Sequence, residues 1–221
     1  MKLELLLLVI ESVLLAFTIV LLLFNIKEGR GREKLLREVG RATKTFTRLE
    51  YFLAVMDAFG DARAEIAGLI TGRFPGPEDR KRTDDIVERI KKARASGVKV
   101  KYLLPSFHDR LYIGHLYTKA GAEIRYSSCA IPFDLRYMIM DESLVIVGIP
   151  ETVGEKEATK KGYRIPSEGV AGLFREHFVN CWDRAVEFEN YLKQVIKKTG
   201  ASAKQLSIEL NIDERELEKY Y

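Results

Sequence analysis

Residues 84–105 read DDIVERIKKARASGVKVKYLLP, and this stretch contains a helix pattern, a glycine stop and a strand pattern in immediate succession. Apolar residues three or four positions apart before Gly97 predict a helix with one buried face. The apolar run at 98–104 predicts a strand, which ends at Pro105. A helix that leads directly into a buried strand is the unit from which α/β folds are built.

The same alternation of helix and strand continues on both sides of this stretch. Residues 64–71 (AEIAGLIT) predict a strand that follows a helix, and AGAEIRYS at 120–127 contains another strand, preceded by a helix over 107–119. We therefore expect one α/β domain over residues 47–192. Its sheet should be mixed but mostly parallel, and helices should flank it.

The second half of the chain is expected to contain a hairpin and one long helix. Residues 137–140 and 144–147 are two apolar runs around Asp141, which predicts a hairpin. Residues 148–168 show no regular pattern and are expected to form a loop. Apolar residues on one face of residues 168–192 predict a single long helix.

The N-terminal residues 5–26 form a nearly continuous apolar run. A helix of this length spans about 33 Å, which is enough to cross the hydrocarbon core of a bilayer. A cleaved signal peptide is the alternative, but it would need a shorter apolar core and a small-residue cleavage site. We expect residues 1–26 to be an uncleaved transmembrane anchor. Glu11 lies inside the run, where it either contacts a membrane partner or reaches toward the interface.

A basic segment follows the apolar run. Residues 27–48 contain eight Lys/Arg and three Asp/Glu residues, and residues 27–46 are expected to form a basic helical linker. Basic flanks stay on the cytoplasmic side of a membrane and are attracted to anionic lipid headgroups. The sequence therefore predicts a single-pass protein of the cell membrane with a cytoplasmic C-terminal domain. Its net charge of +4 is explained by the membrane rather than by nucleic acid.

Cysteine and histidine usage limits the possible chemistry. Charged residues make up 31% of the chain, with four Asn and two Gln, a composition that is typical of thermophilic proteins. Cys129 and Cys181 form no CxxC pair and are expected to be buried free thiols. His108 and His115 are seven residues apart, unlike a metal-binding pair on a helix, and His177 is expected to pack with one hydrogen bond. No metal or other cofactor is expected.

The order of these elements resembles one half of the phospholipase D superfamily. The resemblance covers about residues 47–187, and it is clearest in GVKVKYLLP and in the late helix GLFREHFVNCWDRA at 172–185. Within the superfamily, the chain resembles the non-catalytic effector domain of archaeal TrmB-type transcription regulators. Single-motif members pair two domains to build one site, so the resemblance implies a homodimer, which a membrane anchor would favour by raising the local concentration.

The enzymes of this superfamily carry the motif His-x-Lys-x4-Asp, in which the histidine is the nucleophile or acid and the lysine binds phosphate. With Asp141 in the last position, Asp134 takes the place of the histidine and Arg136 that of the lysine. A carboxylate repels phosphate and does not readily replace an imidazole as nucleophile, whereas an arginine can still bind an anion. The resemblance therefore implies the fold without phosphodiesterase chemistry, and we assign no catalytic residue.

Candidate ligand residues lie at the motif positions and at the ends of predicted strands, where open α/β sheets bind ligands. These anion-binding candidates are Arg136, Asp134, Asp141, Ser106, Ser127 and Ser128. Asp141 also has a purely structural interpretation, because aspartate is favoured in a turn between two strands.

The C-terminal residues 193–221 are expected to form a small helical hairpin. The stretch AKQLSIELNIDERELEKY at 203–220 resembles the first part of a helix-turn-helix. Its second helix is acidic on balance, and acidic groups are repelled by DNA phosphates. We therefore expect the hairpin to pack on the domain or on a partner, and we do not expect it to bind nucleic acid.

Three functions are compatible with these patterns. The first is a non-catalytic interaction or ligand-sensing domain on the inner membrane face, which the degraded motif favours. The second is a divergent membrane-bound phosphodiesterase or nuclease, for which Cys129 or His115 would have to be the nucleophile. The third is a TrmB-like transcription regulator, although the anchor occupies the place of its DNA-binding module.

Overall fold

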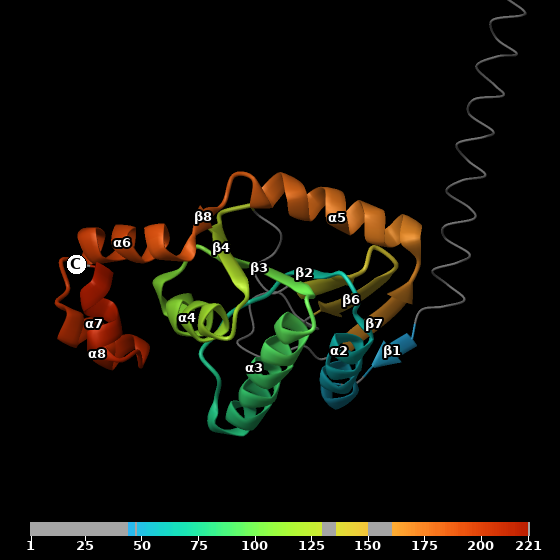
Figure 1. Cartoon of the computed structure of the whole chain (residues 1–221), viewed down its shortest axis with the longest axis horizontal. Helices are drawn as coiled ribbons and strands as arrows, with labels where there is room; N and C mark the ends of the chain where they lie inside the picture. The colour runs from blue at the N-terminus through green and yellow to red at the C-terminus, as the bar shows by residue number, and fades with distance from the viewer. Residues whose placement is uncertain (1–43, 47, 130–135, 150–160, 221) are drawn as a thin grey trace, which may run out of the picture. The chain divides into compact units, whose positions relative to one another are not determined.

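An eight-stranded mixed sheet forms the centre of the structure, a computed structural model that describes residues 44–46, 48–129, 136–149 and 161–220 (Figure 1). The expected anchor at 5–26, with Glu11, lies outside the described residues, as does most of the linker at 27–46. Every helix within the described ranges is too short or too polar to span a bilayer.

The strands and helices follow the expected order over most of the chain, and β2 to β6 lie within two residues of their predicted positions. The strands are β1 (Lys44–Phe46), β2 (Glu65–Leu69), β3 (Lys99–Pro105), β4 (Glu123–Ser127), β5 (Arg136–Met140), β6 (Leu144–Ile149), β7 (Lys161–Pro166) and β8 (Val186–Glu187). The helices are α2 (Arg48–Asp61), α3 (Arg80–Ala95), α4 (Leu111–Lys119), α5 (Glu168–Trp182), α6 (Phe188–Thr199), α7 (Ala203–Leu210) and α8 (Glu214–Leu217). Short 3-10 turns are Pro77–Asp79, His108–Arg110 and Glu218–Tyr220.

The sheet has the strand order β1-β7-β6-β5-β2-β3-β4-β8, and only its middle is parallel. β3 pairs in parallel with β2 and with β4, whereas the other five pairings of the described strands are antiparallel. The expectation of a mostly parallel sheet is therefore wrong. Helices α3 and α4 allow parallel crossovers from β2 to β3 and from β3 to β4, but the tight turn between β5 and β6 forces antiparallel pairing.

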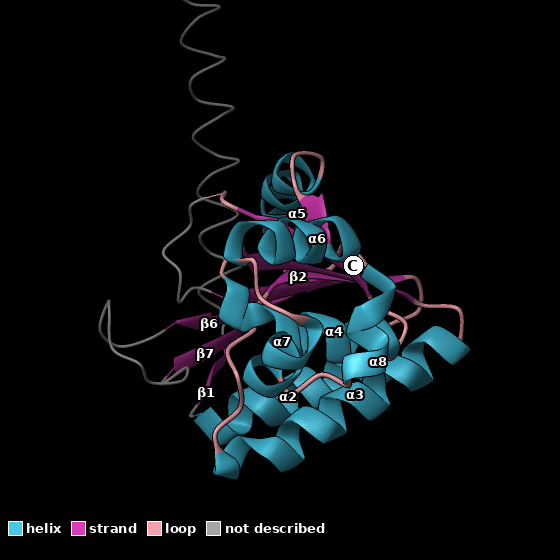
Figure 2. Cartoon of the chain, turned by 90° about the vertical axis from the view of Figure 1, so that its left-hand side faces the viewer, coloured by secondary structure: helices cyan, strands magenta, loops and turns pink. Residues whose placement is uncertain are grey.

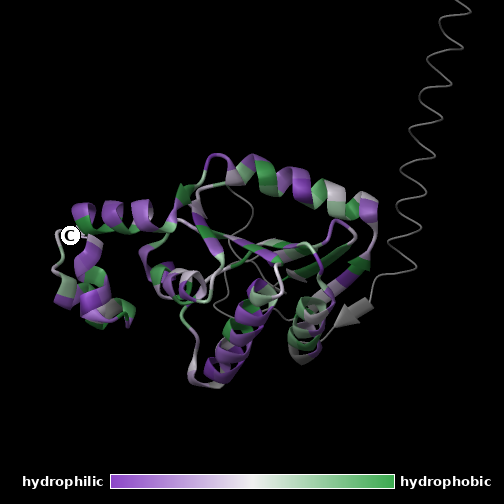
Figure 3. Ribbon diagram, viewed as in Figure 1, coloured by the Kyte–Doolittle hydropathy of each residue, from purple (hydrophilic) through white to green (hydrophobic). Residues whose placement is uncertain are grey.

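Helices cover both faces of the sheet. Helix α5 lies across one face, and α2, α3 and α4 lie on the other (Figures 1 and 2). Side chains alternate between the faces along each strand, so Val100 and Tyr102 of β3 face α2 and α3, while Leu103 faces α5. Figure 3 shows hydrophilic and hydrophobic residues side by side along α3 and α6, as expected of helices that bury one face.

The single long helix expected over residues 168–192 is two helices in the structure. Helix α5 ends at Trp182, and α6 begins at Phe188 after the short strand β8, which pairs with β4. Arg125 of β4 stabilises the break, because its guanidinium donates to the Trp182 carbonyl (3.1 Å) and to the Glu187 carboxylate (3.1 Å). The period of apolar residues does not reveal this break, since the break depends on contacts with a strand about 60 residues earlier in the chain.

The segment at 148–168, expected to be a loop, contains β7. This strand pairs with β6 on one side and with β1 on the other. The residues Lys44–Phe46 are therefore a strand, and not the end of a helical linker. Apolar and polar residues do not clearly alternate in either stretch. These strands are stabilised mainly by backbone pairing with neighbouring strands, and not by one face of buried side chains.

Helix α8 is attached to α4 by its acidic side chain. Glu216 forms an ion pair with His115 (2.7 Å) and with Lys119. Leu206 of α7 and Leu217 of α8 are buried in the same hydrophobic cluster as the sheet residues. Glu216, one of the acidic residues of the second C-terminal helix, thus joins the C-terminal helices to the rest of the domain.

Candidate functional site

A cavity of about 560 Å³ lies between the sheet and the helices α2 and α3. Side chains from α2, α3, α4, β3 and β5 line it, together with the segment 70–76 that follows β2. Its volume is within the range of about 300–1,000 Å³ that is usual for small-molecule sites, and its lining is mostly apolar or aromatic. It is therefore the candidate ligand site of the domain.

The segment after β2 reaches the cavity through a turn at Gly72. This residue has φ +61°, and a Cβ atom placed on it would lie 2.5 Å from Leu104 Cδ2, so only glycine fits. The turn brings Arg73 and Phe74 to the cavity wall. Phe74 is 46% exposed, which shows that this side of the cavity meets the surface.

Among the described residues, the cation that the sheet contributes to the cavity lining is Arg136, at the start of β5. Met138, two positions along, also lines the cavity, because alternate side chains of a strand share a face. Burial raises the pKa of Tyr51 and of Tyr117, and the charge of Arg136 opposes part of this increase. The charge of the guanidinium therefore acts on two phenols of the same cavity lining.

Three buried tyrosines line the cavity beside Arg136: Tyr51 of α2, Tyr102 of β3 and Tyr117 of α4. They are 4%, 1% and 7% exposed, and burial raises the pKa of each phenol, so all three are neutral hydrogen-bond donors. The rings of Tyr102 and Tyr117 are 5.8 Å apart, and Tyr51 and Tyr117 both raise the pKa of Tyr102, so the phenols form one cluster. Within the described part of the chain, no group forms a hydrogen bond with any of these hydroxyls.

The other charges of the lining are mainly positive. Arg82 of α3 pairs with Asp79 (2.7 Å) and lies over the Phe52 ring at 5.2 Å. With Arg73 and Arg136, the described lining contains three arginines and one aspartate. The residues with described placement contain no cluster of three or more His, Cys, Asp or Glu that could hold a metal ion. The electrostatics of the cavity therefore favours an anion.

The structure separates the motif positions. Asp134 lies outside the described residues, and Arg136 and Asp141 are at opposite ends of β5. The Asp141 carboxylate accepts hydrogen bonds from the backbone N–H groups of residues 63–65, at 2.6, 2.8 and 2.9 Å. Burial raises the pKa of this carboxyl, but the three bonds outweigh burial and hold its pKa below the ordinary value. Asp141 thus joins the β5–β6 turn to the start of β2, the structural role that a turn aspartate predicts.

The three candidate serines follow β3 and β4 and are not part of the cavity lining. The Ser106 N–H donates to the Ser127 carbonyl (3.3 Å), and Ser127 Oγ accepts from the Cys129 N–H (3.0 Å). Ser128 is exposed. The structure therefore brings the serines to one edge of the sheet, but it does not place them in the cavity with Arg136.

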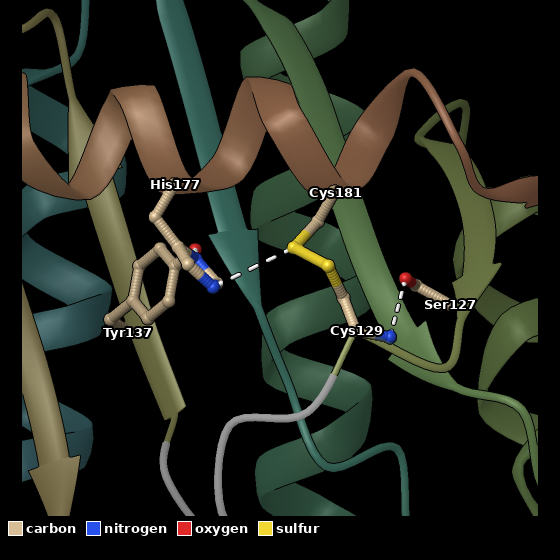
Figure 4. The surroundings of a disulfide bond; sticks show 5 residues. All are labelled: Ser127, Cys129, Tyr137, His177 and Cys181. Atoms are coloured by element: carbon tan, nitrogen blue, oxygen red, sulfur yellow. Dashed lines mark hydrogen bonds between the residues drawn. A yellow bond between two sulfur atoms is a disulfide. The ribbon is translucent and has the colours of Figure 1, made fainter.

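None of the three histidines of the chain lines the cavity. His177 lies on the α5 face of the sheet, where its Nδ1 and the Tyr137 hydroxyl are 2.8 Å apart, as expected of a packing residue (Figure 4). His115 is bound to Glu216, and His108 is exposed in the turn before α4. The cavity beside Arg136 is therefore lined without an imidazole.

The expectation of two free thiols is wrong, because Cys129 and Cys181 form a disulfide (Figure 4). Cys129 follows β4, and Cys181 lies in the last turn of α5, where the Nε2 atom of His177 is 3.6 Å from its sulfur. The two cysteines are 52 residues apart, and only the passage of α5 over the sheet brings them together. As a disulfide sulfur, Cys129 has no thiol that could serve as a nucleophile.

The tyrosine cluster is the part of the site that the sequence patterns did not indicate. Tyr51 belongs to a helical pattern and Tyr102 to a strand pattern, and in both places tyrosine is expected to be an ordinary core residue. The available signal was that a tyrosine on a buried face still needs a partner for its hydroxyl. Which tyrosines lack one depends on how the helices and strands pack.

No protein-family model matches this sequence, and no curated protein matches it. Solved structures are similar to it in fold. Nuc from Salmonella typhimurium, a phospholipase D family member, is 18% identical with a TM-score of 0.51, over 66% of this chain and 97% of that one. NucT from Helicobacter pylori is 13% identical with a TM-score of 0.50, over 66% and 98%. TrmBL2, an archaeal chromatin protein, is 21% identical with a TM-score of 0.47, over 73% and 62%.

The similarities to Nuc and NucT confirm the phospholipase D-like fold that the sequence resemblance implies. The described residues form a phospholipase D-like α/β domain, with a mixed sheet between helices. At 18% and 13% identity the likeness concerns the fold alone. The chemistry of the site therefore depends on its own residues.

Proposed function

We propose that this chain is a non-catalytic phospholipase D-like domain that binds an anionic ligand in the cavity at Arg136. Arg136 takes the motif position of the superfamily's phosphate-binding lysine, and the described cavity lining includes no histidine. A guanidinium binds phosphate and carboxylate groups through two parallel hydrogen bonds. The combination of this arginine with a cavity that lacks an imidazole is the observation that supports the proposal most directly.

The proposal includes a membrane anchor at residues 1–26, a cytoplasmic location of the domain and a homodimer. The apolar run at 5–26 and the basic segment at 27–48 support this topology. A disulfide in a cytoplasmic domain is uncommon in mesophiles, but intracellular proteins of hyperthermophiles are rich in disulfides. The highly charged, amide-poor composition is consistent with such a source.

Binding of inorganic phosphate to the full chain, measured by calorimetry, tests the role of Arg136. The Arg136→Ala substitution is expected to weaken binding by about tenfold or more, because a hydrogen bond to a charged group contributes about 1.5–3 kcal/mol. Arg80→Ala is the matched control, since Arg80 is exposed at the start of α3 and outside the cavity lining. Equal affinities of the two variants would contradict the proposal.

The enzymatic alternative is tested on the same preparations with bis(p-nitrophenyl) phosphate. We expect no hydrolysis above that of the Arg136→Ala variant. A metal-independent activity that disappears in this variant would show that the protein is instead a divergent phosphodiesterase. A gel shift on duplex DNA at physiological salt is expected to show no complex, which tests the transcription-regulator alternative.

The topology is tested with C-terminal reporter fusions in cells. A green fluorescent protein fusion should fluoresce at the membrane, and an alkaline phosphatase fusion should be inactive, because that enzyme needs an oxidising compartment. The opposite pattern would place the domain outside the cytoplasm. Cross-linking of the membrane-bound chain should trap a dimer.

A further inference from the structure

The cavity is larger and more apolar than a bare anion requires. Beyond Arg136, its walls are built largely from apolar and aromatic side chains of α2, α3 and α4, among them Phe52, Val55, Phe59, Ile86 and Ile113. A phosphate or carboxylate group held at Arg136 would leave most of the roughly 560 Å³ unfilled. Water in an apolar enclosure makes few hydrogen bonds, so a ligand with an apolar body is a better occupant.

The tyrosine cluster indicates where the polar part of the ligand lies. Tyr51, Tyr102 and Tyr117 are each more than nine-tenths buried, and their hydroxyls have no hydrogen-bond partner among the described residues. Among the described residues, the fully buried side-chain atoms without a partner do not include these three oxygens, so the hydroxyls open into the cavity, where the oxygens of a ligand can reach them. Neutral phenols donate hydrogen bonds to oxygen atoms, and these three phenols line the same cavity as Arg136, whose charge acts on Tyr51 and Tyr117.

We infer that the ligand is an amphipathic organic anion, with a compact apolar body that carries one phosphate or carboxylate group. The oxygens of this group accept hydrogen bonds from Arg136 and from the three tyrosine hydroxyls, and the body contacts the apolar walls. The inference rests on the proposed function, because it names the ligand class of the same site. A lipid headgroup region and a free metabolite share this chemistry.

The position of the exposed lining residue is consistent with this ligand. Phe74 is 46% exposed, lines the cavity and packs against Tyr112 with the ring centroids 4.6 Å apart. An apolar residue at the open side of a cavity can contact the end of an apolar body that extends outward. The adjacent Arg73 adds a second cation on the same side.

Naphthyl phosphate, which is fluorescent and combines an aromatic body with a phosphate, is a suitable probe. The full chain in phosphatidylcholine nanodiscs is titrated with naphthyl phosphate, and binding is followed by fluorescence anisotropy. Naphthol and inorganic phosphate, which each carry one half of the probe, are the two part-ligands for comparison. We expect naphthyl phosphate to bind at least about tenfold more tightly than either part-ligand, because only the whole molecule uses both the apolar walls and the polar cluster.

Tyrosine-to-phenylalanine variants test the cluster without changing the size of the rings. Tyr51→Phe, Tyr102→Phe and Tyr117→Phe are each expected to weaken naphthyl phosphate binding about fivefold, and the triple variant about a hundredfold. Tyr137→Phe is the matched control, since it makes the same change in the same sheet but on the α5 face. Circular dichroism verifies that each variant is folded.

The outcomes separate this inference from the proposed function. If the naphthyl group adds no affinity and the tyrosine variants bind normally, while Arg136→Ala still weakens phosphate binding, the inference is wrong and the proposed function stands. If neither inorganic phosphate nor naphthyl phosphate binds, both are wrong. Nanodiscs that contain phosphatidic acid provide the last comparison: displacement of the probe supports the inference with a lipid as ligand, and retention of the bound probe supports it with a soluble ligand.

Discussion

On the α5 face of the sheet the buried polar groups have partners, whereas the face under α2 and α3 contains three phenols with none among the described residues. Glu65 contacts Lys101 (2.9 Å) and Arg175 (2.6 Å), and Tyr137 is bonded to His177 on the α5 face. Burial raises the pKa of Glu65, but these two cations outweigh burial and hold its pKa below the ordinary value.

The difference between the two faces distinguishes stability from ligand binding. Paired polar groups contribute to the folded state directly, and the Cys129–Cys181 disulfide adds to this on the α5 side. The hydroxyls of Tyr51, Tyr102 and Tyr117 open into the cavity without a protein partner among the described residues, so they add no such hydrogen bond to the folded state. Their retention in a cavity of ligand size is understandable if a bound molecule supplies the missing acceptors.

The largest effect is expected from removal of the disulfide. A double Cys129→Ser and Cys181→Ser variant should lose about 4 kcal/mol of unfolding free energy in the chain-entropy estimate for a 52-residue separation. Phosphate affinity at Arg136 should change less than about threefold, because the cavity lies on the other face. Urea unfolding followed by the fluorescence of Trp182, the single tryptophan, measures the stability.

Reduction of the unchanged protein is the control for this prediction. A reductant should lower its stability to that of the double variant and should have no effect on the variant itself. A large loss of phosphate affinity in the double variant would show that the two faces of the sheet are coupled. The distinction between a stabilising face and a ligand-binding face would then be wrong.

An intermediate effect is expected at the β5–β6 turn. Asp141→Asn should cost about 2 kcal/mol at neutral pH, because the carboxylate accepts three backbone hydrogen bonds that an amide accepts less well. Since the pKa of Asp141 is lowered by folding, its stabilisation is complete above the ordinary aspartate pKa of about 3.9 and is lost as the pH falls through the folded value.

Urea unfolding at pH values from 7 down to 3 measures this dependence. The stability difference between the unchanged protein and Asp141→Asn should shrink over the acidic part of that range. Asp85→Asn, at an exposed position of α3, should differ from the unchanged protein by no more than about 0.5 kcal/mol. Loss of phosphate binding in Asp141→Asn would assign the residue to the ligand site and contradict its structural role.

The smallest effect, and the sharpest comparison, comes from one substitution made on each face. Tyr137→Phe removes the hydrogen bond to His177 and should cost about 1 kcal/mol. Tyr102→Phe removes a hydroxyl without a described partner and should leave the stability of the ligand-free protein equal or slightly higher. If both changes destabilise the protein equally in urea unfolding, the Tyr102 hydroxyl has a partner, and the distinction between the faces is lost.

Local patterns predicted the parts of the fold whose cause is local. The helix before Gly97, the strand after it and the hairpin around Asp141 each have their own periodicity or turn signal, and each lies close to its predicted place. Strands β1 and β7 were missed because they are stabilised by neighbouring strands. The break between α5 and α6 was missed because it depends on Arg125.

The candidate site was predicted only where it coincides with a motif. Arg136 was found because it occupies the lysine position in the phospholipase D-like pattern, and it does line the cavity. Ser106 and Ser127 were chosen from their position after strands, and they lie at the sheet edge instead. The tyrosines could not be selected, since a buried tyrosine with a partner and one without look the same in a sequence.

By itself, the sequence determined the class of fold and the apolar N-terminal run, because periodicity and length are local properties. Only the tertiary structure decided that most strand pairings are antiparallel, that Cys129 and Cys181 are bonded, and that three phenols share one cavity with Arg136. These features are contacts between residues far apart in the chain, and such contacts are defined only once helices and strands have packed.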